Sequence, residues 1–435
     1  MRTWLDASKV YLERRVFVIL LLGFSSGLPL LLVYSTLSAW LKESDVSLTM
    51  IGLFSWASTA YALKFLWAPV VDSIPLPVLT RLLGQRRSWL VLSQAATMVT
   101  MVGLGGTDPA TELWWTALWA VLLAFASATQ DIVVDAYRIE SLDEDQLGAG
   151  SANYVFGYRI AMLVAGAGAL FIADGYSWYW AYVAMAALMG VGLLTVLLSP
   201  EPDREISFVD HDQSLGAQIR DAIINPFVDF MTRPHWIMIL LFVALYKYGE
   251  ALLGVMANPF YLDMGFSKSE IAAVSKGYGF AMTILGGFMG GVLVARYGIM
   301  RALWYAGLLQ CVANLAFAAQ AQVGYSIPML AVTISIENLT AGMATTAFVA
   351  YLSSLCNVAY TATQYALLSS IMSFARTMFA SGGGWLADNM DWTSYFILTT
   401  FAAVPGLVVL YWLMKRLPIA GPPDGNSVAV QHEER

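Results

Sequence analysis

Charged residues are scarce in this sequence: Lys, Arg, Asp and Glu make up 12% of its 435 residues, whereas hydrophobic residues make up 58%. Soluble globular chains carry about 25% charged and about 45–50% apolar residues. The composition therefore excludes a soluble protein and indicates a chain that folds in a lipid bilayer.

Cysteine and histidine are nearly absent, with two and three residues respectively. Two cysteines in so long a chain exclude a disulfide framework and a Cys-based metal site, so we expect no bound metal. His211, His235 and His432 each fall in a polar stretch or at its edge, so the usual proton carrier near neutral pH is missing from the apolar segments. The net charge of −7 argues against nucleic acid as a partner, because nucleic-acid binders show a basic patch.

Long apolar stretches make up most of the sequence. A membrane-spanning helix needs about 20 mainly apolar residues, and twelve stretches meet that requirement. Their approximate limits are 16–41, 50–72, 88–106, 113–135, 148–173, 177–199, 236–262, 270–295, 301–322, 325–352, 360–386 and 394–417. An even number of spans places both termini on the same side of the membrane.

The basic residues indicate which side that is. Among the Lys and Arg residues outside the twelve stretches, only Lys42 and Lys268 fall in loops on one side, and all the others fall on the opposite side. Cytoplasmic loops carry an excess of Lys and Arg. We therefore expect both termini in the cytoplasm.

A polar connection divides the chain into two sets of six spans. The expected organisation is an N-terminal six-helix bundle (1–199), a cytoplasmic linker (200–235), a C-terminal six-helix bundle (236–417) and a cytoplasmic tail (418–435). A short repeat supports it, since Tyr158-Arg159 before Asp174 is matched by Ala375-Arg376 before Asp388 at an offset near half the length. This layout of two pseudo-symmetric all-α bundles resembles that of major facilitator transporters.

Ionisable residues inside the apolar stretches are the strongest functional signal. Each costs about 2.5–3.5 kcal/mol at bilayer depth on insertion scales and usually faces the interior of the bundle. The basic ones are Lys64, Arg159, Lys247, Lys276 and Arg376, and the acidic ones are Asp131, Asp135, Glu250 and Glu337. The near balance of signs indicates pairing across a polar cavity. Because no histidine lies in a span, one of these four carboxylates must carry any coupled proton.

Spacing refines this interpretation. Asp131 and Asp135 are four residues apart and stack on one helix face, and Lys247 and Glu250, three apart, also share a face. The alternative reading is that these groups form buried ion pairs that only lock helices together. Arg159 and Arg376, at equivalent positions of the repeat, are open to the same reading as structural clamps.

Three further groups carry more specific expectations. Asp72, Arg86 and Arg87, at a helix end and in the following loop, favour an inner gate latch rather than a substrate site. Tyr61 and Tyr158 lie beside the charged positions, where they are able to stack on sugar faces or simply pack helices. The pattern Gly23-Phe-Ser-Ser-Gly27 formally matches a nucleophile elbow, but inside a spanning helix it fits close helix packing better.

Several strings resemble the AmpG-type muropeptide permeases, from the first span to the last. They are Gly23-Phe-Ser-Ser-Gly-Leu-Pro29, Lys64-Phe-Leu-Trp-Ala-Pro69, Gly84-Gln-Arg-Arg-Ser-Trp89, Ala128-Thr-Gln130-Asp131, Gly157-Tyr-Arg159, Leu245-Tyr-Lys-Tyr-Gly-Glu250, Glu337-Asn338 and Ala362-Thr-Gln364. The resemblance adds Gln130, Asn338 and Gln364 to the substrate-binding candidates. Position 250 departs from it, being Glu where the shorter Asp is expected.

The resemblance implies an inner-membrane importer for peptidoglycan recycling, with an indirect role in β-lactam resistance. Its cargo would be N-acetylglucosaminyl-1,6-anhydro-N-acetylmuramic acid, with or without stem peptide, taken up with protons by alternating access. No cofactor beyond the proton gradient is expected, and the partners would be the cargo and the lipid bilayer. A monomer is expected by analogy with other major facilitator proteins.

Other readings stay open at this stage. A different large polar anion, such as an acyl-coenzyme A, is the alternative cargo. A membrane sensor should carry a soluble output domain, and no connection here exceeds about 35 residues, short of the usual 50 or more. An enzyme should show a catalytic constellation, and none is present, so we expect no catalytic residues.

Overall fold

The computed structural model describes residues 10–46, 50, 54, 57, 59–143, 146–202, 224–381 and 383–416, and every regular element in these ranges is helical. The first half contributes η1 (Val10–Leu12), α2 (Arg14–Val33), α3 (Ser35–Glu43), α5 (Thr59–Leu63), η3 (Lys64–Leu66), α6 (Ala68–Ser73), α7 (Leu79–Leu83), α8 (Gln85–Gly105), α9 (Leu113–Ser141), α10 (Leu147–Leu163), η4 (Val164–Gly168), α11 (Ala169–Gly175) and α12 (Trp178–Leu198). We call this set the N bundle.

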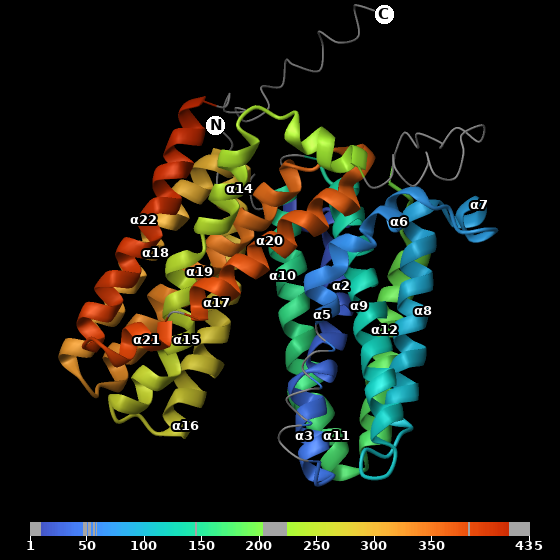
Figure 1. Ribbon diagram of the computed structural model, residues 1–435, viewed down its shortest axis with the longest axis horizontal. Coiled ribbons are helices and arrows are strands. Elements are labelled where there is room, and N and C mark those ends of the chain that lie inside the picture. The colour runs from blue at the N-terminus through green and yellow to red at the C-terminus, as the bar shows by residue number, and fades with distance from the viewer. Residues whose placement is uncertain are drawn as a thin grey trace, which may run out of the picture.

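The second half forms a C bundle of the same kind. Its elements are α14 (Trp236–Leu245), α15 (Tyr248–Asp263), α16 (Lys268–Ile271), η5 (Ala272–Tyr278), α17 (Gly279–Tyr297), α18 (Ile299–Val323), α19 (Ile327–Ser354), η6 (Val358–Tyr360), α20 (Thr361–Ser381), α21 (Gly383–Asp388) and α22 (Trp392–Arg416). Figure 1 shows the two bundles side by side, with α20 lying across toward α5 and α6 of the N bundle.

Ten segments of the described chain are long and apolar enough to cross a membrane. They coincide with ten of the twelve predicted stretches, so the prediction of an all-helical, multi-pass membrane protein is confirmed. The second and eleventh stretches differ. The second lies partly outside the described residues, and its described part is broken into α5, η3 and α6. Lys64 lies in the tight turn, and Pro69 lies in the first turn of α6, where the missing proline N–H costs nothing. The eleventh, α20, is 21 residues long but rich in Thr, Ser and Gln.

Close packing of α2 against α10 confirms the packing interpretation of Gly23 and Gly27. A Cβ built at Gly23 would lie 2.4 Å from the carbonyl oxygen of Tyr154, and one built at Gly27 would lie 2.4 Å from that of Tyr158. Only glycine permits such an approach of two backbones, as in other close helix pairs within membranes. This contact fixes α10, which carries Tyr158 and Arg159, against the first span.

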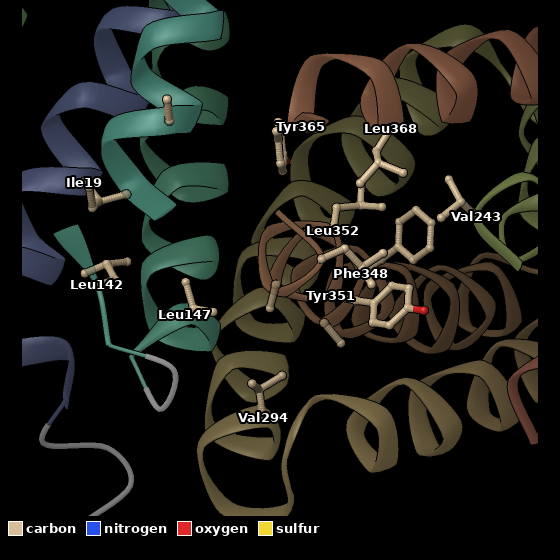
Figure 2. Close-up of a cluster of buried hydrophobic side chains, with 14 of the residues drawn as sticks. Ile19, Leu142, Leu147, Val243, Val294, Phe348, Tyr351, Leu352, Tyr365 and Leu368 are labelled. Carbon is tan, nitrogen blue, oxygen red and sulfur yellow. The ribbon is translucent and has the colours of Figure 1, made fainter. Parts of the chain in front are cut away.

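The hydrophobic cores show where the two bundles join. One cluster contains Ile19, Leu142 and Leu147 of the N bundle together with Val294 and Phe348 of the C bundle. In Figure 2 the first three lie on one side of the view and the last two on the other. The two other clusters belong to one bundle each: residues 28–189 supply the first and residues 253–396 the second. The bundles therefore share a core at one end and have separate cores toward the other.

Hydrogen bonds join the bundles at the same end. The Tyr11 hydroxyl donates to the Phe288 carbonyl (2.9 Å), and Arg138 donates to Ser353 (2.8 Å). Asp72 accepts from Thr363 as described below. We call these contacts and the shared core around them the inter-bundle seal. In Figure 1 the bundles meet at the end that carries α6 and α14 and diverge toward α3 and α16.

Candidate functional site

Four charged side chains of the N bundle form a first cluster around α9. Lys64 Nζ lies 3.5 Å from Asp135 Oδ2, and Arg138 Nη2 lies 3.3 Å from Asp135 Oδ1. Asp131, one helical turn before Asp135, interacts electrostatically with both Lys64 and Asp135. All four residues are buried. Lys64 is the first residue of η3, the short turn between α5 and α6.

Asp131 differs from its neighbours in its hydrogen bonding. Its Oδ1 atom is buried and accepts no hydrogen bond from the described residues, whereas both oxygens of Asp135 face a cation. A buried carboxylate oxygen without a donor is costly when the group is ionised and much less so when it is protonated. Asp131 is therefore the carboxylate of this cluster best suited to hold a proton.

Polar and aromatic side chains surround the first cluster. The Tyr61 hydroxyl donates to Ser127 (2.9 Å), and Gln130 Nε2 donates weakly to Ser25 (3.3 Å). Tyr158 of α10 lies close enough to Asp131 and Tyr61 to interact electrostatically with both. Gln130 keeps a buried Oε1 atom without a hydrogen-bond partner among the described residues. The arrangement combines ring faces, a cation and unsatisfied polar atoms.

A second cluster lies in the C bundle. Lys247, just before α15, forms a short ion pair with Glu250 and donates to Thr345 (2.9 Å). Gln310 of α18 donates to the same Glu250 oxygen at 3.2 Å. The pairing of Lys247 with Glu250 that their spacing predicts is thus present.

Arg159 interacts with the other bundle. It belongs to α10 of the N bundle, yet its electrostatic partners are Glu250, Glu337 and Arg376 of the C bundle. Its Nε atom is buried without a hydrogen-bond partner among the described residues. The guanidinium therefore lies between the bundles, together with two carboxylates and a second guanidinium.

The gate candidates lie at the inter-bundle seal. Arg86 bridges Asp72 (2.6 Å) and Glu140 (2.6 Å) within the N bundle. The Asp72 carboxylate also accepts from the Thr363 N–H (2.7 Å) and hydroxyl (2.6 Å) at the start of α20. Asp72 is therefore an N-terminal cap supplied to a C-bundle helix by the N bundle, a favourable position for a negative charge.

Arg87 has a different environment from Arg86. It donates to the carbonyl oxygens of Val196 and Leu197 (3.0 and 2.9 Å), at the end of α12. Glu201 accepts from the backbone N–H groups of Arg86 and Arg87 and caps α8. Arg87 thus ties α8 to α12 inside the N bundle, and these hydrogen bonds do not cross the seal.

Two of the remaining candidates, Asn338 and Gln364, have hydrogen-bond partners outside the charged clusters. Asn338 accepts from Thr283 (2.6 Å) and lies against Gly279, so it joins α19 to α17. Gln364 donates to Asp229 (2.7 Å) in the segment before α14, beside the seal. Lys276 belongs to η5, and its side chain lies outside the described residues.

Some residues of this network were not anticipated from the sequence. Glu140 and Ser353 lie 54 and 215 positions from their arginine partners, and no local pattern links residues so far apart. Gln310 could have been identified from the sequence, since it is a polar residue in an apolar span.

Two helical bundles that share a seal at one end and hold opposite charges between them define a polytopic membrane transporter. Residues 16–319 and 239–431 match the family model described as Major Facilitator Superfamily. "Putative transporter AmpG 4" of Rickettsia felis is 37% identical over 414 residues, which covers 95% of this chain and 99% of that protein. "Anhydromuropeptide permease" of Escherichia coli K12 is 37% identical over 404 residues and covers 92% of this chain and 80% of its own length.

Solved structures show the same fold at much lower identity. The E. coli fucose:proton symporter FucP matches with a TM-score of 0.67 and 10% identity over 94% of this chain and 99% of its own. The proton:xylose symporter XylE matches with a TM-score of 0.64 and 11% identity over 96% and 97%. The chain therefore belongs to the Major Facilitator Superfamily, among its AmpG-type transporters, and is not an enzyme.

Proposed function

We propose that this protein imports anhydro-muropeptides across the bacterial inner membrane for peptidoglycan recycling, with protons as the coupled ion. The observation that carries the proposal is the placement of Arg159 between the bundles, facing the carboxylates of Glu250 and Glu337. Single charges at membrane depth are retained for transport pathways and proton relays. The 37% identity to an anhydromuropeptide permease supports the cargo.

The chemistry of the cargo fits the residues between the bundles. An anhydro-muropeptide presents a lactyl or peptide carboxylate, amine groups on longer stem peptides, and two sugar faces. Lys64, Arg159 and Arg376 supply cations for the carboxylate, Glu250 supplies an anion for an amine, and Tyr158 supplies a ring for a sugar face. The two bundles supply different side chains to the site, which suits a cargo whose parts differ in chemistry.

The seal supports a particular conformation for this structure. Arg86, Arg138 and Arg296 lie at or near the end where the bundles join, and the excess of basic residues assigns that end to the cytoplasm. With the cytoplasmic end closed and separate cores toward the other, the structure corresponds to the outward-facing state of an alternating-access cycle. Release of cargo then requires the seal to part.

Asp131 is the residue we assign to proton uptake. Protonation removes the negative charge of Asp131, one of the two carboxylates that attract Lys64. This lysine is then available to the cargo carboxylate. Replacement of Asp131 by Asn should leave uptake insensitive to the proton gradient. Asp108→Asn, in the exposed loop before α9, is the matched control and should behave as wild type.

The test is uptake of labelled N-acetylglucosaminyl-1,6-anhydro-N-acetylmuramic acid into proteoliposomes at a series of imposed proton gradients. Uptake by Asp131→Asn that rises with the gradient as steeply as wild type would remove Asp131 from the coupling. Competition by an unlabelled acyl-coenzyme A that exceeds competition by unlabelled muropeptide would instead favour the alternative cargo.

A further inference from the structure

The Asp135 carboxylate is divided between two cations. Its Oδ2 atom lies 3.5 Å from Lys64 Nζ, and its Oδ1 atom lies 3.3 Å from Arg138 Nη2. Hydrogen bonds between an ionised nitrogen and a carboxylate normally measure about 2.7–2.9 Å. Neither contact is therefore tight, and the two cations compete for the same carboxylate.

The two cations belong to different parts of the molecule. Lys64 lies beside Asp131 in the first charged cluster. Arg138 reaches across the seal, where Nη1 donates to Ser353 (2.8 Å) and the guanidinium lies 5.2 Å from the centre of the Tyr365 ring. Asp135 is thus the one described carboxylate that contacts both a cargo-site cation and a seal cation.

Parting of the bundles would leave Arg138 short of partners. This side chain is fully buried, its Nε atom has no hydrogen-bond partner among the described residues, and its N-bundle contacts apart from Asp135 are Ser151 (3.2 Å) and the Tyr154 ring. A buried guanidinium without an anion is strongly unfavourable. A two-oxygen pairing with Asp135 would compensate for the loss of the C-bundle contacts. To form it, the carboxylate must move closer to Arg138, and its attraction to Lys64 opposes that movement.

We propose that Asp135 couples occupancy of Lys64 to the inter-bundle seal. A cargo anion that binds Lys64 releases Asp135, which then pairs with Arg138 through both oxygens and lets the bundles part. Asp135 and Arg138 act in this step as positioning residues. The inference rests on the proposed function for the identity of the anion, and the geometry of the three side chains carries the rest.

Several other ionisable groups of the described chain face Asp135, and none of those named below is a cation. The other ionisable groups that face it are Asp131 on α9, Tyr154 and Tyr158 on α10, Tyr365 on α20 and Cys356 after α19. All of these are neutral or anionic. Release of Lys64 therefore strengthens the contact with Arg138 and no other.

The C bundle provides an internal contrast. Lys247 also pairs with a carboxylate, Glu250, but among the described residues that carboxylate accepts hydrogen bonds from Lys247 and the neutral Gln310. No described contact leads from Glu250 to Arg138. Removal of the Lys247 charge should therefore not loosen the seal in the absence of cargo, because Glu250 keeps its attraction to Arg159 of the other bundle.

Cys356 is a native reporter at the seal. It follows Ser353 by three residues and interacts electrostatically with Asp72, Asp135 and Arg138 of the N bundle. Burial raises the pKa of its thiol, so its reaction with a maleimide is slow while the seal is closed. A Cys311→Ser background leaves this thiol as the single reactive site, since the chain has two cysteines.

The experiment measures the rate at which a membrane-impermeant maleimide modifies Cys356 in the full-length protein in lipid nanodiscs. Lys64→Met should raise the rate about tenfold without cargo, the effect of one hydrogen bond to a charged group. Asp135→Asn should not raise the rate, and the double variant should match Asp135→Asn. Added disaccharide cargo should raise the rate in the parent protein but not in Asp135→Asn.

The direction of each change in the maleimide reaction rate distinguishes this switch from a general loss of packing. Loss of packing would raise the rate in both single variants and raise it further in the double variant, and that result would overturn the proposal. An unchanged rate in Lys64→Met would also overturn it, as would a rise in the Lys247→Met control equal to that of Lys64→Met. If the Lys64→Met and double-variant results hold while the disaccharide has no effect on any protein, the switch stands and the proposed cargo is wrong.

Discussion

Replacement of Asp72 by Asn removes one negative charge from the inter-bundle seal while keeping the shape of the side chain. Asp72 Oδ1 accepts from Arg86 (2.6 Å) and weakly from the Ala362 N–H (3.3 Å), and Oδ2 accepts from the N–H and hydroxyl of Thr363 (2.7 and 2.6 Å). In the variant, the amide NH2 faces either Arg86 or Thr363, and both of these groups are donors. One set of contacts must therefore be lost.

The size of the effect follows from those contacts. A hydrogen bond to a charged group contributes about 1.5–3 kcal/mol, and a charge at a helix end about 0.3–1 kcal/mol, with up to ~2 kcal/mol when partly buried. The seal should weaken by about 2–4 kcal/mol, which shifts the equilibrium toward the open cytoplasmic end by about 30-fold to about 700-fold. Arg86 retains Glu140 at 2.6 Å, so the N bundle itself should stay folded.

Distance measurements between spin labels report this shift directly. Labels at Arg81→Cys on α7 and Lys415→Cys on α22 occupy exposed positions on different bundles at the sealed end, in a background with Cys311 and Cys356 replaced by Ser. The Asp72→Asn variant should add a longer-distance population that is minor in the parent protein.

Asp391→Asn is the matched control. Asp391 caps α22 with the same chemistry, accepting from the Ser394 N–H (3.0 Å) and hydroxyl (2.8 Å), but both partners belong to the C bundle. Its loss should leave the distances unchanged. If Asp72→Asn gives the distance distribution of the parent protein while remaining folded, the charge of Asp72 does not hold the seal, and the reasoning from its contacts is refuted.

Two further variants test the packing and electrostatics of the N bundle. Gly157→Ala should lower the melting temperature of the purified protein by the equivalent of about 1–3 kcal/mol, because a Cβ there would lie 2.1 Å from the Leu20 carbonyl oxygen. Gly190→Ala is the control and should be nearly neutral, since a Cβ there meets open space. Equal shifts in the two variants would contradict the steric argument. Burial raises the pKa of Glu201, so this carboxylate binds a proton more readily in the folded state than in the unfolded chain. The contribution of Glu201 to stability therefore falls as the pH rises from the ordinary pKa range of a glutamate through the raised pKa. Glu201→Gln should remove that decrease from melting curves recorded across the range, and an unchanged slope would contradict it.

Much of the architecture was predictable because it depends on local composition. Ten of the twelve predicted stretches are spanning-length helices in the described chain, and the excess polarity of α20 and the break at Lys64 explain the other two. The sidedness of the termini and the number of twelve spans stay predictions. The close contact at Gly23 and Gly27 also followed from the sequence, since small residues four apart on an apolar helix favour a near neighbour.

The candidate site was predictable only in part. Pairs on one helix, such as Lys247 with Glu250, follow from helical spacing. The pattern did not separate Arg86, which bridges Asp72 and Glu140, from Arg87, which binds the end of α12. Two adjacent residues of a helix point about 100° apart, so their partners depend on how that helix is rotated against its neighbours.

The order of apolar and polar segments, the two-part division of the chain and the identity of the ions held at membrane depth were determined by the sequence alone, because each depends on the chemistry of neighbouring residues. Only the tertiary structure decided which ions meet: Asp135 with both Lys64 and Arg138, and Arg159 with carboxylates of the other bundle. Those meetings depend on the rotation and register of helices far apart in the chain, which many small packing contacts set together and no single pattern encodes.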